Sequence, residues 1–341
     1  MWPVHENYFL TNKKSTSCFW GTKTRERGFC VSFGQIHFYS LSLVITHVTY
    51  LLYIFHHTKR AYLKQRKVTI LIRIWFHKIY SLFQVARPED ISSRYATDPI
   101  YFRRWFYADY NFTVVTLWSP FLVRSSDVHS SLTNLYLDKA DESWSGELKN
   151  FDFVIISAGQ WFFRPALFYE KGQVVGCHKC EQSNITELSH YHGYRKAFRT
   201  ALRTIVKMKG YKGVTFLRTF SPAHFENSEW NKGGSCERRK PYGKEEMKFD
   251  GYIFETYKVQ VEEFRGARRE GRKRGLKFLM LNTTEMMLRR PDGHPNNHVW
   301  GHEMKNTHSD CVHWCLPGPI DTWNELLFYQ LKTHHKSFIS S

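Results

Sequence analysis

The sequence has little of what marks a fibrous, low-complexity or disordered protein. Its 20 Gly and 11 Pro are scattered without a period, which excludes collagen-like and repetitive chains. Disordered proteins are also poor in aromatic residues, whereas 17% of these 341 residues are Phe, Trp or Tyr. The chain can therefore bury a hydrophobic core, and its length suits one large α/β domain or two ordinary domains.

Acidic residues are scarce in the first quarter of the chain. Residues 1–84 hold 12 Lys and Arg but only two Glu, and they supply more than half of the net charge of +18. Residues 85–341 are only mildly basic, so the charge gives little support for a nucleic-acid partner, and we expect none. The basic run 265–274 is typical of a solvated helix end, and docking of an acidic partner is the alternative.

Residues 1–84 also lack the alternation of capped helices, turns and strands that a folded domain shows. Within them, residues 36–55 contain no charged side chain, and about 20 apolar residues can span a bilayer. Two His, three Tyr and several Thr and Ser dilute this stretch, so a weak membrane segment and a non-membrane segment both remain open. No secretory signal pattern stands at the N-terminus.

From residue 85 onward, strand and helix patterns alternate. An apolar stripe from Tyr194 to Met208 at helical spacing predicts a helix, and further helices are predicted over 255–270 and from Asp321. Strands alternating with helices indicate a parallel sheet covered on both faces, with sites in the loops beyond the carboxyl ends of the strands. The runs that predict strands are 112–118, 151–157, 214–217 and 276–281.

The seven cysteines allow two kinds of cross-link. Cys177-His-Lys-Cys180 and Cys311-Val-His-Trp-Cys315 resemble zinc ligands, but structural zinc sites use paired short spacings and these two spacings differ. We therefore expect disulfides and no metal. Three glycosylation sequons agree with an oxidising secretory compartment, at Asn111, Asn184 and Asn282.

The stretch richest in chemical groups is Asp310-Cys-Val-His-Trp-Cys-Leu-Pro-Gly-Pro319. An Asp three residues before a His can orient one imidazole nitrogen while the other serves as a general base. This spacing alone is common, and a surface Asp beside a hydrogen-bonded His is the ordinary alternative. The flanking Cys, Trp and Pro-Gly-Pro predict a rigid loop, which favours Asp310 and His313 as catalytic residues.

From about residue 84 to the C-terminus, the chain resembles the plant trichome birefringence-like family, which acetylates cell-wall polysaccharides in the Golgi. The family's Asp-x-x-His block corresponds to the stretch that begins at Asp310. The other matching blocks are Arg218-Thr-Phe-Ser-Pro-Ala-His-Phe-Glu226 with Trp230 and Cys236, Ile156-Ser-Ala-Gly-Gln-Trp161, Tyr107-Ala-Asp-Tyr-Asn-Phe112 and Trp118-Ser-Pro-Phe-Leu-Val123. The sequences of these blocks, together with Arg290-Pro-Asp-Gly-His294, are most similar to those of the xyloglucan-acetylating branch.

The resemblance implies the three-layer α/β/α fold of SGNH and GDSL-like esterases and a transfer through an acetyl-Ser intermediate. It implies that His313 takes the Ser proton and later deprotonates the sugar hydroxyl, with Asp310 holding its ring. The implied partners are a xyloglucan-like acceptor and an acetyl donor of unknown identity, without a cofactor, in the Golgi lumen with membrane association.

Five further residues are candidates for the oxyanion or substrate site. The Gly159 N–H and the Gln160 amide are candidate oxyanion donors, although an ordinary turn is an equal alternative. Trp161 and Trp230 are candidates for stacking on sugars, or for the core. Arg218 is a candidate for binding the acceptor, or for a buried ion pair.

The family's nucleophilic Ser stands in a Gly-Asp-Ser motif after the first strand, and this sequence contains no Gly-Asp-Ser. Ser81 is the nearest upstream Ser, but no Gly-Asp precedes it, so the nucleophile remains unknown. We hypothesise that residues 1–84 are translated intron or misjoined sequence, and that 85–341 is the family domain. The fold would then be truncated or altered at its N-terminal strand, and a non-catalytic, glycan-binding role is the alternative function.

Overall fold

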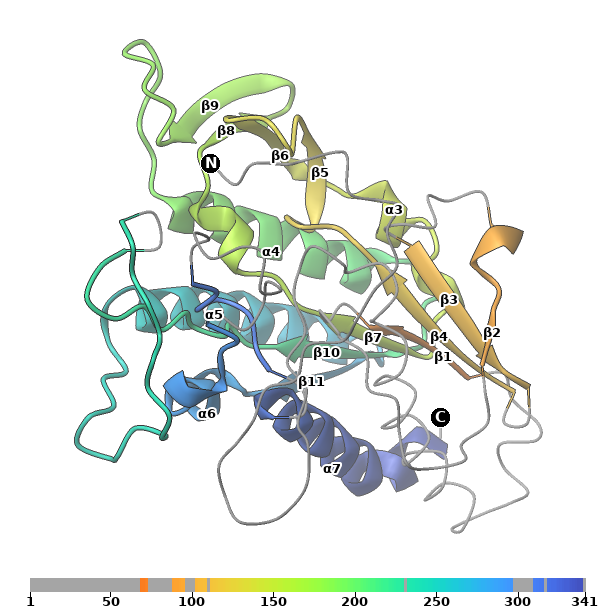
Figure 1. Cartoon of the computed structure of the whole chain (residues 1–341). Helices are drawn as coiled ribbons and strands as arrows, with labels where there is room; N and C mark the ends of the chain where they lie inside the picture. Colours follow the sequence, from red (N-terminus) through yellow and green to blue (C-terminus); the bar gives the residue numbers. More distant parts are fainter. Residues whose placement is uncertain are drawn as a thin grey trace.

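The computed structural model describes residues 68–72, 88–95, 102–108, 111–229, 232–296, 309–315 and 318–339. These residues form a seven-stranded sheet, a four-stranded sheet and the helices that pack on them (Figure 1). The uncharged stretch 36–55, Ser81 and Trp230 lie outside the described residues. In the part of the chain that is described, no helix combines the length and apolar character needed to cross a membrane.

The larger sheet has the strand order β11-β10-β7-β1-β4-β3-β2. Strands β11, β10, β7, β1 and β4 run parallel, and β3 and β2 add antiparallel at one edge. The four predicted strand runs are confirmed as β4, β7, β10 and β11. The bounds are β1 Val68–Ile72, β2 Glu89–Asp90, β3 Phe102–Tyr107, β4 Phe112–Leu117, β7 Phe153–Ile156, β10 Val214–Arg218 and β11 Lys277–Leu281.

Strand β1 occupies the place between β4 and β7. Its residue Ile70 lies opposite Val114 on one side and Phe153 on the other. Of the two expected outcomes at the N-terminal strand, truncation is therefore not observed, because a strand occupies this place. The short apolar run Val-Thr-Ile-Leu-Ile has the β-branched composition that suits a strand buried within a sheet. It stands before residue 84, so the sheet draws on both sides of the boundary that composition suggests.

Alternate side chains of the large sheet enter two separate cores. Val154 and Ile156 belong to the core with helices α4 (His190–Lys207) and α5 (Gly251–Arg272). Ile155, between them, belongs to the core with α6 (Thr284–Leu288) and α7 (Pro319–Ile339). Figure 1 shows α7 across the sheet from α4 and α5. The period of two thus places helices on both faces, which confirms the three-layer α/β/α fold.

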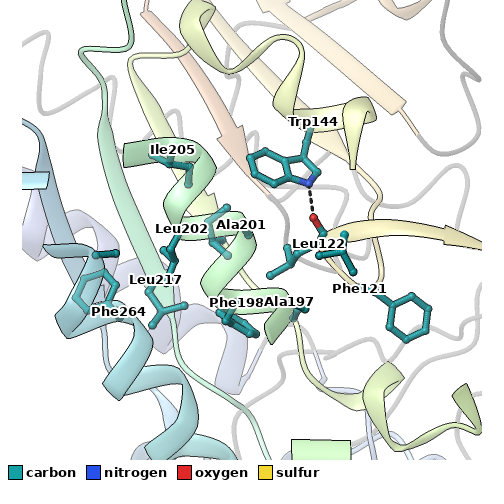
Figure 2. Close-up of a cluster of buried hydrophobic side chains, with 14 of the residues drawn as sticks. Phe121, Leu122, Trp144, Ala197, Phe198, Ala201, Leu202, Ile205, Leu217 and Phe264 are labelled. Atoms are coloured by element: carbon teal, nitrogen blue, oxygen red, sulfur yellow. Dashed lines mark hydrogen bonds between the residues drawn. The ribbon is translucent and has the colours of Figure 1, made fainter. Parts of the chain in front are cut away.

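Helix α4 forms the centre of the first core, as its apolar stripe predicts. Phe198, Leu202 and Ile205 are almost completely buried and belong to the same core as Leu217 of β10 and Phe264 of α5 (Figure 2). Aromatic and branched side chains of this size each contribute about 1.5–3 kcal/mol when fully buried. This packing fixes β10, whose carboxyl end carries Arg218, against α4 and α5.

The arginines on the other side of α4 bind helix α5. Arg199 donates to both carboxylate oxygens of Glu263, at 2.6 and 2.9 Å. Arg195 contacts Glu262 and Glu263 at 2.7 and 3.3 Å. At the end of α5, the basic run 265–274 places its Arg and Lys side chains on the surface, as expected for a solvated helix end.

The four-stranded sheet was not expected from the sequence, so the prediction of a single parallel sheet is incomplete. Its order is β5-β6-β8-β9, with only β6 and β8 parallel. Lys171 and Gly172, with φ of 53° and 81°, form a two-residue turn between β8 and β9. The bounds are β5 Val123–Ser126, β6 Thr133–Ala140, β8 Ala166–Glu170 and β9 Gln173–His178.

The short elements connect these layers. Among them, Trp144 of α3 donates its indole N–H to the Leu122 carbonyl at 3.0 Å, which anchors the chain between the two sheets (Figure 2). Helix α3 spans Glu142–Ser145. The short 3₁₀ helices are η3 Ser92–Arg94, η5 Leu148–Asn150, η6 Gln160–Phe163 and η7 Pro291–Gly293.

The central place of β1 predicts the effect of a proline within it. Ile70→Pro removes a backbone donor from the sheet interior, and leaving a buried partner unsatisfied costs about 1–3 kcal/mol. We expect the free energy of unfolding, measured by urea denaturation, to fall by at least that amount. Ile70→Val keeps the N–H and the β-branched shape, so its unfolding curve should lie close to that of the wild type. Equal curves for all three proteins would show that β1 is not part of the sheet.

Candidate active site

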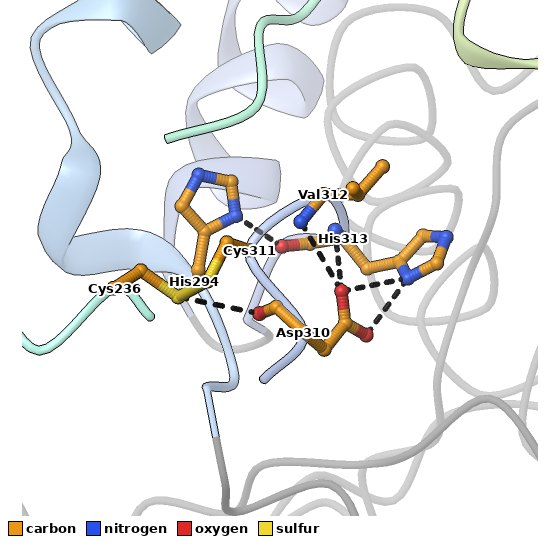
Figure 3. Close-up of polar contacts among 6 residues, drawn as sticks. All are labelled: Cys236, His294, Asp310, Cys311, Val312 and His313. Carbon is orange, nitrogen blue, oxygen red and sulfur yellow. Dashed lines mark hydrogen bonds and ion pairs between the residues drawn. A yellow bond between two sulfur atoms is a disulfide. The ribbon is translucent and has the colours of Figure 1, made fainter. Parts of the chain in front are cut away.

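The loop that carries Asp310 and His313 is fixed at several backbone points. Asp310 pairs with Asn296 through two backbone hydrogen bonds of 3.0 and 3.1 Å. The Cys315 N–H donates to the Gly293 carbonyl at 2.7 Å. A disulfide joins Cys311 to Cys236, 75 residues earlier in the sequence (Figure 3). The loop is therefore rigid, as its Cys and Pro-Gly-Pro sequence predicts.

Asp310 and His313 face one another, as the sequence analysis expects (Figure 3). His313 Nδ1 lies 2.7 Å from Asp310 Oδ2 and 2.9 Å from Oδ1. The Asp310 carboxylate is ionised at neutral pH and can only accept hydrogen bonds. Nδ1 of His313 therefore carries the hydrogen, and the lone pair of the neutral ring lies on Nε2. Asp310 is 4% exposed, whereas the His313 side chain is 27% exposed. This arrangement gives a general base with a fixed tautomer.

Backbone donors also hold the Asp310 carboxylate. The N–H groups of Val312 and His313 donate to Oδ1 at 3.2 and 3.0 Å. Burial raises the pKa of Asp310, but the charge of His313 and the hydrogen bonds from His313 and Val312 outweigh it and leave the pKa below its usual value. The carboxylate is thus ionised and able to stabilise a protonated His313.

Two further histidines, to which the sequence alone gave no role, contact this loop. His224 Nδ1 lies 2.7 Å from His294 Nε2, and His294 Nδ1 lies 2.5 Å from the His313 carbonyl oxygen. The backbone N–H of His224 donates to the backbone carbonyl of Cys311 at 3.0 Å. Both histidines stand in motif blocks of the sequence, which is the one signal that pointed to them.

Arg218 lies at the carboxyl end of β10 and binds two hydroxyl groups. Its Nε lies 2.9 Å from Ser157 Oγ, and its Nη1 lies 2.6 Å from Ser221 Oγ. The guanidinium carbon lies 4.3 Å from the ring centroid of Trp323 in α7. Burial lowers the pKa of Arg218 to about 10, so the group stays charged at neutral pH. Its hydrogen-bond partners in the described residues are hydroxyls, so the expected alternative of a buried ion pair is not observed there.

Gly159 and Gln160 lie beside the cluster of Arg218, Ser157 and Ser221, in the loop that follows β7. The Gln160 amide donates to the Ser221 carbonyl at 3.0 Å, so one of its two N–H groups has a structural role. A Cβ at Gly159 would come within 2.8 Å of the Phe220 ring, which explains why glycine stands there. The loop that begins at Thr219 connects this cluster to the loop of His313, because it carries both Ser221 and His224.

Trp161 packs mainly with protein rings. Its ring lies edge-to-face against Trp118 at 5.6 Å and Phe121 at 6.0 Å between centroids. The guanidinium of Arg164 lies 4.7 Å over the same indole. These contacts favour the core alternative for Trp161, while Trp230 lies outside the described residues.

A cavity of about 550 Å³ lies next to His224. His224 contributes to its wall, which also carries aromatic and acidic side chains and Lys248. Aromatic faces and carboxylates are the groups that bind sugar rings and hydroxyls. Among the lining residues are Phe225, Tyr242, Tyr252, Glu229, Glu246 and Asp250.

The cysteines form two disulfides in the part of the chain that is described, Cys177–Cys180 and Cys236–Cys311. Cys315 is buried and belongs to neither. Within the described residues, Cys177 and Cys180 form with Glu187 the one cluster spaced like metal ligands. A disulfide offers no thiolate to a metal, so the oxidised pair does not fit a zinc site.

Comparison with known proteins gives a family model and several relatives. The model of the PC-Esterase family, described as a GDSL/SGNH-like acyl-esterase family found in Pmr5 and Cas1p, matches residues 81–330. Protein trichome birefringence-like 19 of Arabidopsis thaliana is 45% identical over 267 residues, 76% of this chain and 62% of that protein. Xyloglucan O-acetyltransferase 4 of Populus trichocarpa is 44% identical over 236 residues, 67% of this chain and 56% of that protein.

Xyloglucan O-acetyltransferase 1 of Arabidopsis thaliana is similar as well. It is 42% identical over 238 residues, which cover 68% of this chain and 55% of that protein. The chain thus spans between half and two thirds of the length of these relatives. The likeness covers the part of the chain that carries Arg218, Asp310 and His313.

The two disulfides predict unequal losses of stability. Cross-links stabilise more when they close longer loops, so Cys236–Cys311 contributes about 4 kcal/mol and Cys177–Cys180, with only three residues of separation, about 2 kcal/mol. We expect Cys236→Ser with Cys311→Ser to lower the free energy of unfolding more than Cys177→Ser with Cys180→Ser, by guanidinium denaturation. Equal losses would contradict this order.

The lowered pKa of Asp310 predicts an acid-sensitive contribution to stability. A carboxyl whose pKa is lower in the folded than in the unfolded chain stabilises the fold above its unfolded pKa, and this stabilisation is lost as the pH falls through the folded pKa. The free energy of unfolding of the wild type should therefore fall more steeply below about pH 4 than that of Asp310→Asn. Parallel curves for the two proteins from pH 5 to pH 2 would oppose this assignment.

Proposed function

Because the chain belongs to the GDSL/SGNH-like acyl-esterase family found in Pmr5 and Cas1p, we propose that it is an O-acetyltransferase acting on a plant cell-wall polysaccharide. The observation that carries the proposal is the Asp310–His313 pair, a general base held in one tautomer within a rigid loop. Relatives more than 40% identical are named xyloglucan O-acetyltransferases, which favours xyloglucan as the acceptor.

In the proposed reaction, His313 Nε2 removes the proton of the nucleophile while that group attacks the acetyl carbonyl of the donor. The donor's leaving group departs with a proton, and a sugar hydroxyl then attacks the acetyl-enzyme. His313 takes the proton of this hydroxyl, the acetyl group passes to the sugar as its bond to the nucleophile breaks, and His313 returns the proton to the freed nucleophile. Asp310 stabilises the imidazolium at each protonated stage through the 2.7 Å contact with Nδ1.

The nucleophile of this reaction is a Ser by family resemblance, and its residue number remains open. In the fold, the position for it follows the carboxyl end of β1, after Ile72. The residues from 73 to 87, which include Ser81, lie outside the described residues. A Ser-His-Asp triad is therefore proposed with two of its three members assigned, His313 and Asp310.

Charge that develops on the acetyl oxygen requires donors, and each lost donor costs about 2.7–4 kcal/mol of transition-state stabilisation. The Gly159 N–H and the second amide N–H of Gln160 are the proposed donors. The bond from Gln160 to the Ser221 carbonyl supports this role, since it fixes the orientation of the amide. Arg218 adds a positive charge at the neighbouring strand end, held by Ser157 and Ser221.

We propose the cavity beside His224 as the acceptor site. Its tyrosines and carboxylates suit a neutral polysaccharide, which offers apolar ring faces and hydroxyls. The acetyl donor is a co-substrate of unknown identity, and the proposed reaction needs no cofactor.

We also propose that the protein acts in the Golgi lumen in association with the membrane. The two disulfides among the described residues agree with an oxidising compartment.

The absence of Gly-Asp-Ser favours a second candidate, a glycan-binding accessory protein that keeps the fold without the reaction. Loss of the nucleophile in a Ser-His-Asp triad lowers turnover by about six orders of magnitude in a studied protease. The two candidates differ in transfer but share binding of the acceptor. Binding of xyloglucan oligosaccharide without acetyl transfer would favour this second function.

Acetyl transfer to xyloglucan oligosaccharide, followed by mass spectrometry, tests the first candidate. We expect His313→Ala to abolish transfer and Asp310→Asn to lower kcat by about 10⁴-fold, because the amide no longer holds the required tautomer. His192→Ala on helix α4 is the matched control and should transfer like the wild type. Undiminished transfer by His313→Ala would refute the mechanism.

A further inference from the structure

The hydrogen bonds of His224 and His294 fix which of their nitrogens carry hydrogen. His224 Nε2 lies 3.0 Å from the Leu288 carbonyl oxygen, and His294 Nδ1 lies 2.5 Å from the His313 carbonyl oxygen. A carbonyl only accepts hydrogen bonds, so both of these nitrogens must be donors. Each ring has thereby used the single N–H that a neutral imidazole possesses.

The remaining two nitrogens, His224 Nδ1 and His294 Nε2, face each other at 2.7 Å. If both rings were neutral, two lone pairs would meet at this distance, and both rings are only 6% exposed, which leaves little room for water between them. A third proton on the pair resolves the conflict, because one facing nitrogen then donates to the other. The two rings together then hold three protons and one positive charge.

We propose that His224 and His294 share one proton between their facing nitrogens, and that this charged pair is a positioning element for His313. The position of the proton follows from the hydrogen bonds alone, whereas the effect on His313 rests on the proposed acetyl transfer. Through His294 Nδ1, the pair holds the backbone carbonyl of His313 and so the start of its side chain (Figure 3). Without the shared proton, one ring must turn and give up its carbonyl.

Charged neighbours favour one proton and oppose a second. Asp310, near His294, and Asp292, near His224, both act to raise the pKa of the ring beside them. Burial is the largest influence on both rings and lowers the pKa of His224 to about 4 and that of His294 to about 3, and the charges of His224 and His313 add to the lowering at His294. These pKa values oppose a proton held by either ring alone, so the shared proton rests on the two nitrogens that face each other at 2.7 Å.

Other side chains around His224 and His294 determine how strongly the neighbouring carboxylates stabilise a positive charge on these two rings. Arg290 binds both oxygens of Asp292 at 2.9 and 3.0 Å, so its positive charge offsets the negative charge of Asp292. Among the described residues, Asp310 has no such arginine partner. The rings of Tyr242 and Trp314 complete the contacts, with centroids 5.9 Å from His224 and 4.1 Å from His294 respectively. Burial of each ring alone would remove its proton, but the proton between two acceptors at 2.7 Å is bound by both.

Nuclear magnetic resonance of the ¹⁵N-histidine-labelled full chain tests the proton directly and needs no substrate. At pH 7, we expect three ring N–H protons on the pair, with one strongly downfield, and loss of that signal in His224→Leu. Two neutral rings with two N–H protons at pH 7 would overturn the shared proton. This result would leave the proposed acetyl transfer untouched.

The effect on His313 is tested by the pH dependence of acetyl transfer. When the pair loses its proton at alkaline pH, the hold on His313 weakens, so kcat should fall there in the wild type. His224→Asn supplies an uncharged amide N–H to His294 Nε2, so its alkaline fall should be flattened. His224→Leu, which supplies no donor, should lose kcat on the order of tenfold at all pH values, since displacements of about 1 Å cost up to about 100-fold.

If His224 only contacted the acceptor, its substitution would change KM and leave the shape of the pH profile of kcat unaltered. An unflattened alkaline fall in His224→Asn, in a protein whose thermal unfolding matches that of the wild type, would overturn the positioning role. If the wild type transfers no acetyl, the proposed function fails, and the resonance experiment still decides the shared proton.

Discussion

The arrangement of the site depends on one buried carboxylate. Removing Asp310 from water is costly unless its oxygens are paired, and here they meet His313 Nδ1 and two backbone N–H groups. The backbone donors come from the next residues of the same loop, so the loop must curl around the carboxylate. The same contacts that compensate the buried charge therefore point the imidazole outward in a defined tautomer.

The surrounding fold supplies two clusters at the carboxyl edge of the sheet. Ser157 and Arg218 stand at the ends of neighbouring parallel strands, which brings together side chains 61 residues apart. The loop that follows Arg218 then reaches the His313 loop through His224. Parallel strands thus position the candidate anion-stabilising groups, and a disulfide-bonded loop positions His313, the proposed base.

Local patterns in the sequence predicted the local features. The helical stripe of α4 and the four apolar strands are confirmed, and Asp310 and His313, three residues apart, meet as expected. Features that depend on distant partners were not predictable in this way. The pairing of β1 with β4 and β7, the pairing of Cys236 with Cys311, and the contact between His224 and His294, 70 residues apart, arise only when the chain folds. For Trp161, composition did not separate a sugar platform from a ring packed against Trp118.

The disulfide between Cys236 and Cys311 closes a covalent ring that contains helix α5 and edge strand β11. An edge strand has hydrogen-bonded neighbours on one side only and is ordinarily among the first segments to open. Here both ends of the segment return to the same anchored point beside Asp310, so the edge cannot drift away while the ring is closed. The disulfide thereby ties that border of the sheet covalently to the loop that carries Asp310 and His313.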